Sequence, residues 1–324
     1  MTAPRVYVAL QQFCEHDDRP RRFLEGAGFE VRLNMLGRRL RRDELPQLLR
    51  DAHAVIAGVE PYDAELLATL PQLQCISRCG VGTDAIDLDA ARARGIAVYT
   101  TVEDVVEPVA QMTVAMILAL ARNLPLHVAD VRAGQWRKHT GRLLSEWSVG
   151  LIGCGRIGRA VAQYLRAFGP RVLVADPVLT SREAPEGTVL CSLERLLAEA
   201  DLVSVHAGRR REEGALLGAR ELAQMKPGSF LVNTARGHLV DERALQAALE
   251  RGHLAGAALD VFEEEPYAGP LHRLPNVLCT PHVATLTRAS RMAMEWRCAR
   301  HVVEHFHRQQ TIAPHAAGTS GASR

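Results

Sequence analysis

A short glycine-rich turn between an apolar run and a helical pattern constrains this chain more than any other feature. The run 149–152 is apolar, Gly153, Gly155 and Gly158 follow with the spacing G-x-G-x-x-G, and an apolar-periodic segment continues from Gly158. This layout is typical of dinucleotide binding: the first glycine permits a tight turn, the second lets a pyrophosphate approach the backbone, and the third lets the helix pack closely. An empty turn of the same shape is the alternative.

Two neighbouring features favour the dinucleotide. Arg156 and Ile157 open the helix, so their free N–H groups and the positive end of the helix dipole face the phosphates. The next apolar run, 172–175, ends at Asp176, about where an acid that binds the adenosine ribose belongs. The sequence therefore predicts a strand–turn–helix unit that binds NAD.

Strand-like runs alternate with helical patterns on both sides of this turn, which predicts parallel sheets with helices on both faces. We expect an α/β protein with two Rossmann-like or flavodoxin-like lobes and a cleft between them. Residues 1–99 plus 286–324 are predicted to form a substrate-binding domain, and residues 100–285 an NAD-binding domain. The strands are expected at 5–10, 29–33, 54–57, 73–77, 96–99, 148–152, 172–176, 202–206, 229–233, 256–260 and 277–280. The helices are expected at 19–27, 43–52, 62–70, 158–168, 192–199, 218–225, 241–251 and 286–309.

One long apolar-periodic segment, 108–131, separates the two lobes in the sequence. Pro108 suits the first turn of a helix, whereas Pro125 should break or kink it. Because the pattern is apolar nearly all round, we expect this helix to be buried inside a domain or against a second subunit. Glu107, Pro108 and Gln111 interrupt the apolar stretch, which makes it a poor membrane span.

Composition narrows the class of protein. A net charge of +2, with 47% hydrophobic and 23% charged residues, is typical of a globular protein without a nucleic-acid or membrane partner. The arginine clusters at 38–42 and 209–211 are interpreted as solvated faces. Seven scattered cysteines without a C-x-x-C pair, and no secretory signal at the start, indicate reduced thiols in the cytoplasm. The 13 histidines do not cluster, so no metal site is predicted.

Three chemically distinct side chains follow three predicted strands of the second lobe. Arg236 follows the strand 229–233, Glu265 follows 256–260, and His282 follows 277–280. In open α/β sheets, ligands bind at the carboxyl ends of the strands. A histidine can take the proton of a hydroxyl, a carboxylate can fix its tautomer, and a guanidinium can hold a substrate carboxylate. The trio suits hydride transfer at a 2-hydroxy or 2-keto acid, although each residue alone could be an ordinary surface group.

The motifs together resemble those of one family. The segments 76–88, 150–158, 225–237, 258–266 and 280–282 are similar to the D-2-hydroxyacid dehydrogenases, most closely the phosphoglycerate dehydrogenase-like branch without a regulatory domain. The resemblance implies that Arg236 binds substrate and that Glu265 pairs with His282, the acid and base. It implies a homodimer formed through a helical arm of the cofactor lobe, and a small 2-hydroxy or 2-keto acid, phosphoglycerate- or hydroxypyruvate-like, as substrate. The implied NAD contacts are Gly153, Gly155, Arg156, Ile157, Gly158, Asp176, His206, Thr234, Ala235 and Asp260. The implied substrate contacts are Arg78, Cys79, Gly80, Val81 and Gly82.

The chain departs from the family pattern at several positions. Thr100–Glu103 stands where members commonly have Asn-Thr-Pro-Gly, Gln111 replaces a glutamate, and Gly208–Arg211 replaces Leu-Pro-x-Thr. The arginines of the last segment could attract a 2′-phosphate or a phosphorylated substrate, whereas Asp176 would repel a 2′-phosphate. Glu60, in a loop where phosphoglycerate enzymes often place a basic group, is a poor neighbour for a substrate phosphate. A dinucleotide-sensing corepressor-like protein and a formate- or phosphite-type dehydrogenase use the same scaffold and are the alternatives.

Overall fold

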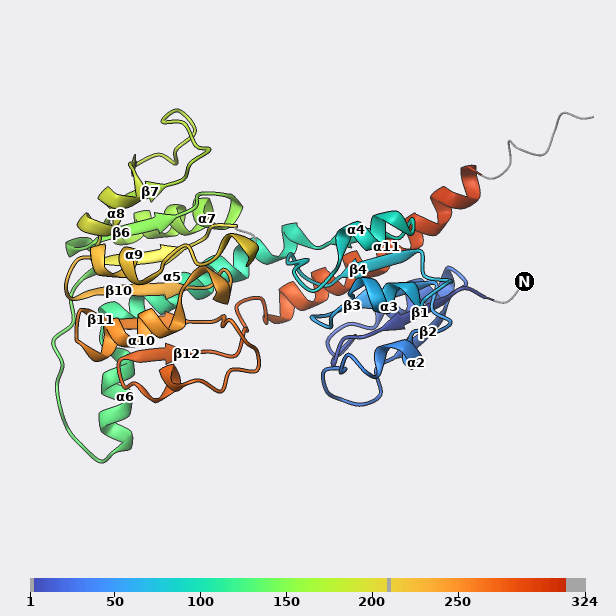
Figure 1. Cartoon of the computed structure of the whole chain (residues 1–324), viewed down its shortest axis with the longest axis horizontal. Coiled ribbons are helices and arrows are strands. Elements are labelled where there is room, and N and C mark those ends of the chain that lie inside the picture. Colours follow the sequence, from blue (N-terminus) through green and yellow to red (C-terminus); the bar gives the residue numbers. More distant parts are fainter. Residues whose placement is uncertain (1–2, 209–210, 313–324) are drawn as a thin grey trace, which may run out of the picture. The chain divides into compact units, whose positions relative to one another are not determined.

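The chain forms two compact units, each built on its own parallel sheet (Figure 1). The computed structural model describes residues 3–208 and 211–312, with side chains as far as residue 308. The first unit contains the described residues up to Val105 and from Thr287 onward, and the second unit spans Val106–Leu286. These junctions lie close to the expected 99/100 and 285/286.

The first unit holds a five-stranded sheet of order β2-β1-β3-β4-β5 in which every strand pair is parallel. This is a flavodoxin-like order, in which the strand order, not the strand direction, reverses between β1 and β3. The register pairs Ala57 with Arg78, so the loops that follow β3 and β4 start side by side. The elements are β1 Arg5–Val8, α1 Arg19–Gly26, β2 Glu30–Leu33, α2 Leu45–Leu48, β3 Ala54–Ala57, α3 Ala64–Ala68, β4 Cys75–Arg78, α4 Leu88–Ala93, β5 Ala97–Thr100, η1 Val102–Val105 and α11 Arg288–Ile312.

The second unit holds a seven-stranded parallel sheet of order β12-β11-β10-β9-β6-β7-β8. The order reverses between β6 and β9, which is where doubly wound sheets leave a crevice for a ligand. Its helices are α5 Val106–Ala121, α6 Leu124–Arg132, η2 Leu144–Glu146, α7 Arg156–Leu165, η3 Arg166–Phe168, α8 Leu193–Glu199, η4 Arg211–Glu213, α9 Ala219–Gln224, η5 Gly237–Leu239, α10 Glu242–Glu250 and η6 Pro270–Arg273. Its strands are β6 Ser148–Ile152, β7 Arg171–Ala175, β8 Thr188–Leu190, β9 Leu202–Val205, β10 Ser229–Asn233, β11 Leu254–Leu259 and β12 Val277–Cys279.

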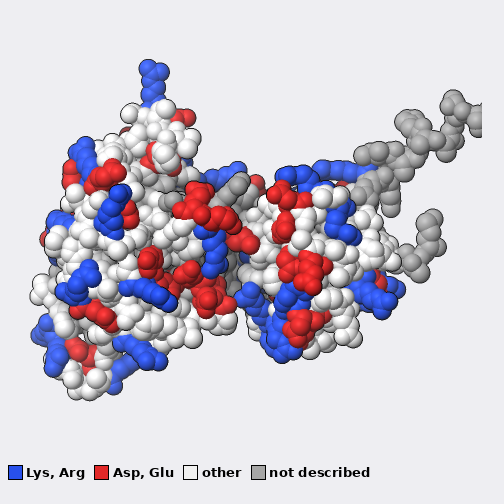
Figure 2. Space-filling view, viewed as in Figure 1, with Lys and Arg blue, Asp and Glu red and all other residues white. Residues whose placement is uncertain are grey.

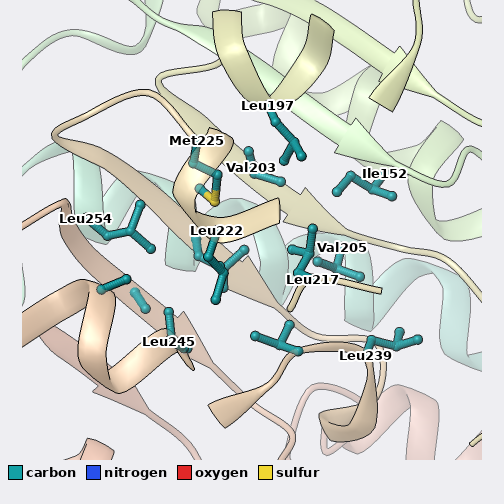
Figure 3. Close-up of a cluster of buried hydrophobic side chains, with 14 of the residues drawn as sticks. Ile152, Leu197, Val203, Val205, Leu217, Leu222, Met225, Leu239, Leu245 and Leu254 are labelled. Atoms are coloured by element: carbon teal, nitrogen blue, oxygen red, sulfur yellow. The ribbon is translucent and has the colours of Figure 1, made fainter. Parts of the chain in front are cut away.

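Buried aliphatic side chains hold each sheet to its helices. In the second unit, Leu197 of α8, Leu222 of α9 and Leu245 of α10 are fully or almost fully buried against Val203 and Val205 of β9 (Figure 3). The strands β6, β7, β9, β10 and β11 are each buried at all but at most one residue, because both faces of a parallel sheet are covered. The predicted fold class of two parallel-sheet α/β lobes is therefore confirmed.

The segment 108–131, predicted as one long buried helix that Pro125 breaks or kinks, forms two helices, and only the first of them is buried. The helix α5 ends at Ala121, Asn123 adopts a left-handed backbone with φ of 51°, and a second helix, α6, starts at Leu124. Pro125 lies in the first turn of α6, where its missing N–H has no helical acceptor to lose. Although the helical stretch Val102–Ala121 is long and apolar enough to cross a membrane, α5 packs into the core of the second unit. None of the residues of α6 is buried.

Apart from the 3-10 helices, one short α-helix and one short strand were not predicted. The helix α4 follows Asp87, whose carboxylate accepts a hydrogen bond from the backbone N–H of Ala90 at 2.9 Å. That aspartate is a helix N-cap signal, so the sequence did carry the information. The three-residue strand β8 lies at the sheet edge and pairs with β7 alone, which gives it little apolar pattern to recognise.

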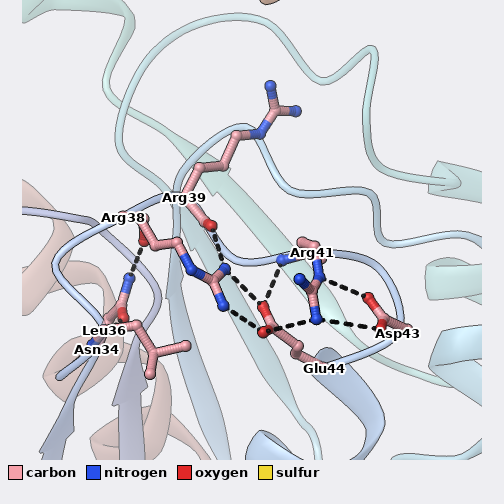
Figure 4. A network of polar contacts seen from close by, with 7 residues as sticks. All are labelled: Asn34, Leu36, Arg38, Arg39, Arg41, Asp43 and Glu44. Carbon is pink, nitrogen blue, oxygen red and sulfur yellow. Dashed lines mark hydrogen bonds and ion pairs between the residues drawn. The ribbon is translucent and has the colours of Figure 1, made fainter.

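The arginine-rich segment 38–42 lies on the surface of the first unit with acidic partners. Arg38 pairs with Glu44 at 2.5 Å, and Arg41 contacts both Asp43 and Glu44, at 3.2 and 3.4 Å (Figure 4). On the face drawn in Figure 2, Lys and Arg are interspersed with Asp and Glu. This arrangement agrees with the interpretation of residues 38–42 as a solvated face. In the cluster 209–211, Arg209 and Arg210 lie outside the described residues.

Candidate active site

The glycine turn is built from backbone packed directly on backbone. Gly153 has a φ of +87°, and a Cβ there would stand 2.7 Å from the backbone of His206 and Ala207. A Cβ at Gly158 would overlap the carbonyl oxygen of Gly153. Above Gly155, by contrast, a Cβ would meet no atom within 4 Å. The first and third glycines are therefore required by the fold, and the second leaves open space over the backbone for a ligand.

The open space lies at the start of α7 and beside an anchored carboxylate. Arg156 and Ile157 are the first residues of α7, and their N–H groups form its free end. Asp176 directly follows β7; its Oδ2 accepts the N–H of Cys154 at 2.8 Å and its Oδ1 that of Val178 at 3.0 Å. These hydrogen bonds, the one from Cys154 first, lower the pKa of Asp176. A carboxylate has lone pairs beyond these two bonds, which a ribose diol can use.

His206 presents an unpartnered polar atom beneath the same turn. Its Nε2 lies 2.9 Å from Ser204 Oγ, while its buried Nδ1 has no hydrogen-bond partner among the described residues. Burial lowers the pKa of His206 to about 4, so the ring is neutral at pH 7. A buried atom of this kind is usually satisfied by a ligand or a water, which fits a dinucleotide in the turn. The residues present thus fit NAD, although their contacts with it stay predictions.

The three predicted catalytic residues follow three adjacent strands of the second sheet, β10, β11 and β12. His282 Nδ1 lies 2.8 Å from Glu265 Oε2, and about a third of each side chain is exposed. Glu265 is itself oriented, because its Oε1 accepts the N–H of Phe262 at 3.1 Å. Arg236 lies directly before η5, with Nη1 2.6 Å from the carbonyl oxygen of Ala235.

Close packing ties the arginine loop to the loop that carries Glu265. A Cβ at Gly237 would overlap the backbone of Phe262 and Glu263. Asn233, at the end of β10, donates from Nδ2 to the carbonyl oxygen of Arg236 at 2.8 Å. Neither Asn233 nor Gly237 was predicted as a site residue, because their effect depends on contacts between loops rather than on their own chemistry.

Thr234 and Ala235, predicted to contact NAD, are anchored in the same loop. Asn233 accepts the N–H of Ala235 at 3.0 Å through its Oδ1. Thr234 is buried, and its Oγ1 lies 2.8 Å from Thr113 Oγ1 of α5. These bonds fix the backbone at the end of β10.

Asp260 organises the histidine loop. It is fully buried and accepts hydrogen bonds from Thr280 Oγ1 at 2.5 Å, from the N–H of Val283 at 2.9 Å and from that of Ala284 at 2.8 Å. These bonds hold the backbone on both sides of His282, whose φ of 55° is unusual for a residue with a side chain. In the described structure Asp260 therefore positions His282, and its predicted contact with the nicotinamide end of NAD stays a prediction.

The predicted substrate loop lies in the first unit, after β4. The Arg78 guanidinium folds back over its own loop, with Nε 3.1 Å from the carbonyl oxygen of Gly82 and Nη1 bonded to that of Cys79. Gly80 has a φ of +143°, and its N–H donates to Thr101 Oγ1 at 2.8 Å. Within the described chain, no acceptor is found for the N–H groups of Val81 and Gly82. The loop thus turns its carbonyl groups toward Arg78 and leaves two amide donors for an anion.

Three of the residues at which the chain departs from the family pattern each have a partner within their own unit. Glu60 is 3% exposed, and its Oε2 accepts the N–H of Gly58 at 2.9 Å. Arg211 lies 3.6 Å from Glu263, so this cation already has an anionic partner. Gln111 is exposed and donates to Glu107 at 2.6 Å, on the surface of α5.

Among the described residues, no group of three or more His, Cys, Asp or Glu side chains is arranged to hold a metal ion.

A methyl group at Gly237 tests whether the two loops must touch. Gly237→Ala should lower the free energy of unfolding by about 1–3 kcal/mol, because the neighbouring atoms are backbone and cannot rotate away. Chemical denaturation followed by circular dichroism measures this change. Gly26→Ala is the control, since a Cβ there meets nothing within 4 Å. Equal stability of both variants would contradict the packing described.

His206 should make stability depend on pH. Its folded pKa of about 4 lies below the ordinary value of 6.5, so the unfolded chain binds the proton first. The stabilisation is complete above pH 6.5 and is lost as the pH falls toward 4. Between pH 6.5 and pH 4, the free energy of unfolding of the wild type should therefore fall by about 3 kcal/mol more than that of His206→Gln. If the free energy of unfolding falls equally with pH in the two proteins, His206 is not buried in its neutral form.

Several known proteins are similar to this chain over much of its length. Residues 114–284 match the family model of the NAD binding domain of D-isomer specific 2-hydroxyacid dehydrogenases. A D-3-phosphoglycerate dehydrogenase of Mycobacterium tuberculosis is 40% identical over 251 residues, 76% of this chain and 48% of that protein. The chain thus spans about half the length of that relative. A glyoxylate reductase of Thermococcus litoralis is 35% identical over 81% of this chain and 83% of that protein.

A solved structure extends the similarity to nearly the whole chain. The D-lactate dehydrogenase of Aquifex aeolicus, crystallised with NAD and lactic acid, is 29% identical with a TM-score of 0.81, and the match covers 98% of this chain and 100% of that chain. The prediction of NAD as cofactor is confirmed by the family of the second unit. The chain belongs to the family of D-isomer specific 2-hydroxyacid dehydrogenases.

Proposed function

We propose that this chain is an NAD-dependent dehydrogenase that interconverts a D-2-hydroxy acid and its 2-keto acid. The observation that carries the proposal is the contact of 2.8 Å between His282 Nδ1 and Glu265 Oε2 in an NAD-binding unit. That pair, with Arg236 on an adjacent strand end, supplies a proton-transfer group and a cation for a carboxylate.

Glu265 sets the state of the histidine. Its carboxylate accepts the Nδ1–H of His282, which leaves Nε2 to exchange a proton with the substrate oxygen. During reduction of a keto acid, His282 gives its Nε2 proton to the carbonyl oxygen; during oxidation it takes the hydroxyl proton. NAD, when bound, supplies the hydride acceptor, and its reduced form the donor. The negative charge of Glu265 stabilises the imidazolium that exists before or after the transfer.

Two groups of residues are proposed to hold the substrate carboxylate. Arg236 offers a planar fork of N–H donors that matches a carboxylate and polarises the neighbouring carbonyl. In the first unit, the N–H groups of Val81 and Gly82 are two donors that we propose contact an anionic group of the substrate. Arg78 would act by holding the carbonyl groups of this loop away from the anion. We accordingly propose that the loop after β4 gives the first unit its part in substrate binding, and that the second unit binds NAD and contributes Arg236.

We infer that the substrate carries no phosphate and resembles hydroxypyruvate or glyoxylate. Glu60 is buried in the loop after β3, whose last residue pairs with Arg78 in the sheet register. Burial raises the pKa of Glu60, and in either protonation state this side chain offers no cation to a phosphate. Phosphohydroxypyruvate should therefore be a poorer substrate than its unphosphorylated analogue.

The reaction is tested by following NADH absorbance with hydroxypyruvate, glyoxylate, pyruvate and phosphohydroxypyruvate. We expect turnover of the unphosphorylated acids, and a loss of kcat of about 10²–10⁴-fold in His282→Ala, because a positioned acid–base group contributes that much. His272→Ala, an exposed histidine of η6, is the matched control and should keep full activity. No turnover of any keto acid would contradict the proposal.

Two other outcomes of the same assay identify the alternatives. Formate and phosphite are added to the panel together with NAD. Oxidation of either compound would indicate a formate- or phosphite-type dehydrogenase. Tight binding of NADH without turnover of any substrate would favour a dinucleotide-sensing corepressor-like protein.

We also propose that the protein is a cytoplasmic homodimer that pairs through α6. Leu124, Val128 and Val131 lie on one face of this helix and are 50%, 45% and 58% exposed. Trp136 and Leu143, in the segment that follows, are 87% and 64% exposed. Contiguous exposed apolar side chains of this size are typical of a protein interface. The seven cysteines are all free thiols, which fits a reducing compartment.

Light scattering coupled to size exclusion tests the dimer. The wild type should elute with twice the mass of one chain, and Val128→Glu should give a monomer because it places a charge in the apolar face. Val178→Glu is the control, since Val178 is 86% exposed elsewhere in the second unit. A wild-type monomer, or a Val128→Glu dimer as stable as the wild type, would exclude this interface.

A further inference from the structure

The loop that carries Glu265 is bonded to the first residue of a neighbouring helix. Glu242, at the start of α10, accepts the backbone N–H of Glu263 at 2.7 Å through its Oε1. Glu263 and Glu265 belong to the same loop, between β11 and η6. The bond therefore fixes a peptide group close to the carboxylate that contacts His282.

Charge pairing does not explain the position of Glu242. Its side chain is half-buried, and the main charge effects on it come from three acids, Asp241, Glu263 and Glu264. Burial raises the pKa of Glu242, the hydrogen bond from the N–H of Glu263 lowers it, and the charges of the three acids raise it further. The hydrogen bond to the loop is thus the interaction that favours a carboxylate at this position.

Two consecutive N–H groups connect this bond to the proposed catalytic pair. The N–H of Glu263 donates to Glu242, and that of Phe262, the preceding residue, donates to Glu265 Oε1 at 3.1 Å. The other carboxylate oxygen of Glu265 lies 2.8 Å from His282 Nδ1. Because the two planar peptide groups meet at one Cα atom, the direction of the first N–H restricts that of the second. The acceptor on α10 thus bears on the orientation of Glu265.

Packing holds Phe262 but not Glu263. Phe262 is buried, stacks on Tyr267 with ring centroids 4.1 Å apart, and has its backbone against Gly237. Glu263 is exposed, and a groove lined by both Glu263 and Glu242 lies beside it. Because no side chain fills this groove, the hydrogen bond to Glu242 must supply the restraint that close packing supplies elsewhere.

We propose that Glu242 is a positioning residue, whose hydrogen bond to the N–H of Glu263 keeps the Glu265 carboxylate turned toward His282 Nδ1. The effect on catalysis rests on the proposed function. Loss of the bond should lower kcat, because Glu265 then holds the reactive tautomer of His282 for less of the time. The KM for the keto acid should stay the same, since the groups proposed to hold the substrate carboxylate follow β10 and β4 rather than β11.

Three substitutions separate the hydrogen bond from the charge. Glu242→Gln keeps an acceptor of the same length without the charge and should keep the kcat of the wild type. Glu242→Asp keeps the charge at the start of the helix but withdraws the acceptor from Glu263, and Glu242→Ala removes both. The last two variants should each lose about tenfold in kcat, as expected for one hydrogen bond to a charged group. Glu250→Ala, an exposed glutamate at the other end of α10, is the matched control and should be unaffected.

Two measurements on the full-length protein test the same role without turnover. Hydrogen exchange followed by mass spectrometry should show the amide of Glu263 exchanging about tenfold faster in Glu242→Asp and Glu242→Ala than in the wild type and Glu242→Gln. Unchanged exchange in the strands of the second sheet shows that each variant is folded. In protein labelled with ¹⁵N-histidine, the His282 signals, assigned by their loss in His282→Gln, should report the Nδ1–H tautomer in the wild type and a mixture of both tautomers in the Asp and Ala variants.

Three results would overturn the proposal: Glu242→Gln as impaired as Glu242→Ala, a Glu242→Asp variant with the exchange rate and His282 tautomer of the wild type, or an equal loss of kcat in Glu250→Ala. If the wild type reduces no keto acid but the tautomer of His282 changes as expected, the proposed function fails and the positioning role stands. If the wild type turns over and exchange and tautomer are the same in all variants, the positioning role fails and the proposed function stands.

Discussion

Direct packing of backbone on backbone at a few glycines is the constraint on which the rest of the second unit depends. Gly153 lies against the end of β9, Gly158 lies against Gly153, and Gly237 lies against Phe262. No side chain fits at these contacts, so the loops they join are fixed to within the size of a methyl group. The first two contacts place the start of α7 at the point where the strand order reverses, and the third holds the loop of Arg236 against the loop that carries Glu265.

Buried polar groups then position what the glycines leave exposed. Asn233 and Asp260 lie at the ends of adjacent strands and use both of their side-chain polar atoms to hold backbone of the loops that follow. Because of these bonds, Arg236, Glu265 and His282 are presented from anchored loops although they are partly exposed. This division, in which buried residues position the side chains that are proposed to react, is what a preorganised site requires.

Most of the fold, and the positions of the candidate site residues after their strands, could be predicted from the sequence because both leave local signals. Parallel strands buried on both faces are continuous apolar runs, and the glycine turn has a fixed spacing. Features set by contacts between distant segments leave no such signal. Pro125 predicted an interruption of the helix over 108–131, but the break itself lies at Asn123, whose left-handed backbone the apolar pattern does not reveal. Likewise, Asp260 carries a carboxylate that suits a cofactor contact, and only the structure relates it to the loop of His282.

The proposed function makes one claim above the others: hydrogen passes directly between the nicotinamide and carbon 2 of a keto acid held in one orientation. Two separate reductions of hydroxypyruvate test this claim directly. One uses NADH deuterated on one face of the nicotinamide C4, and the other uses NADH deuterated on the opposite face. Nuclear magnetic resonance and chiral analysis of the product measure where the deuterium lies and which enantiomer forms. We expect D-glycerate with deuterium on carbon 2 from one of the two deuterated cofactors. L-glycerate, or a product without deuterium on carbon 2 from either cofactor, would contradict the proposed arrangement of Arg236, Glu265 and His282.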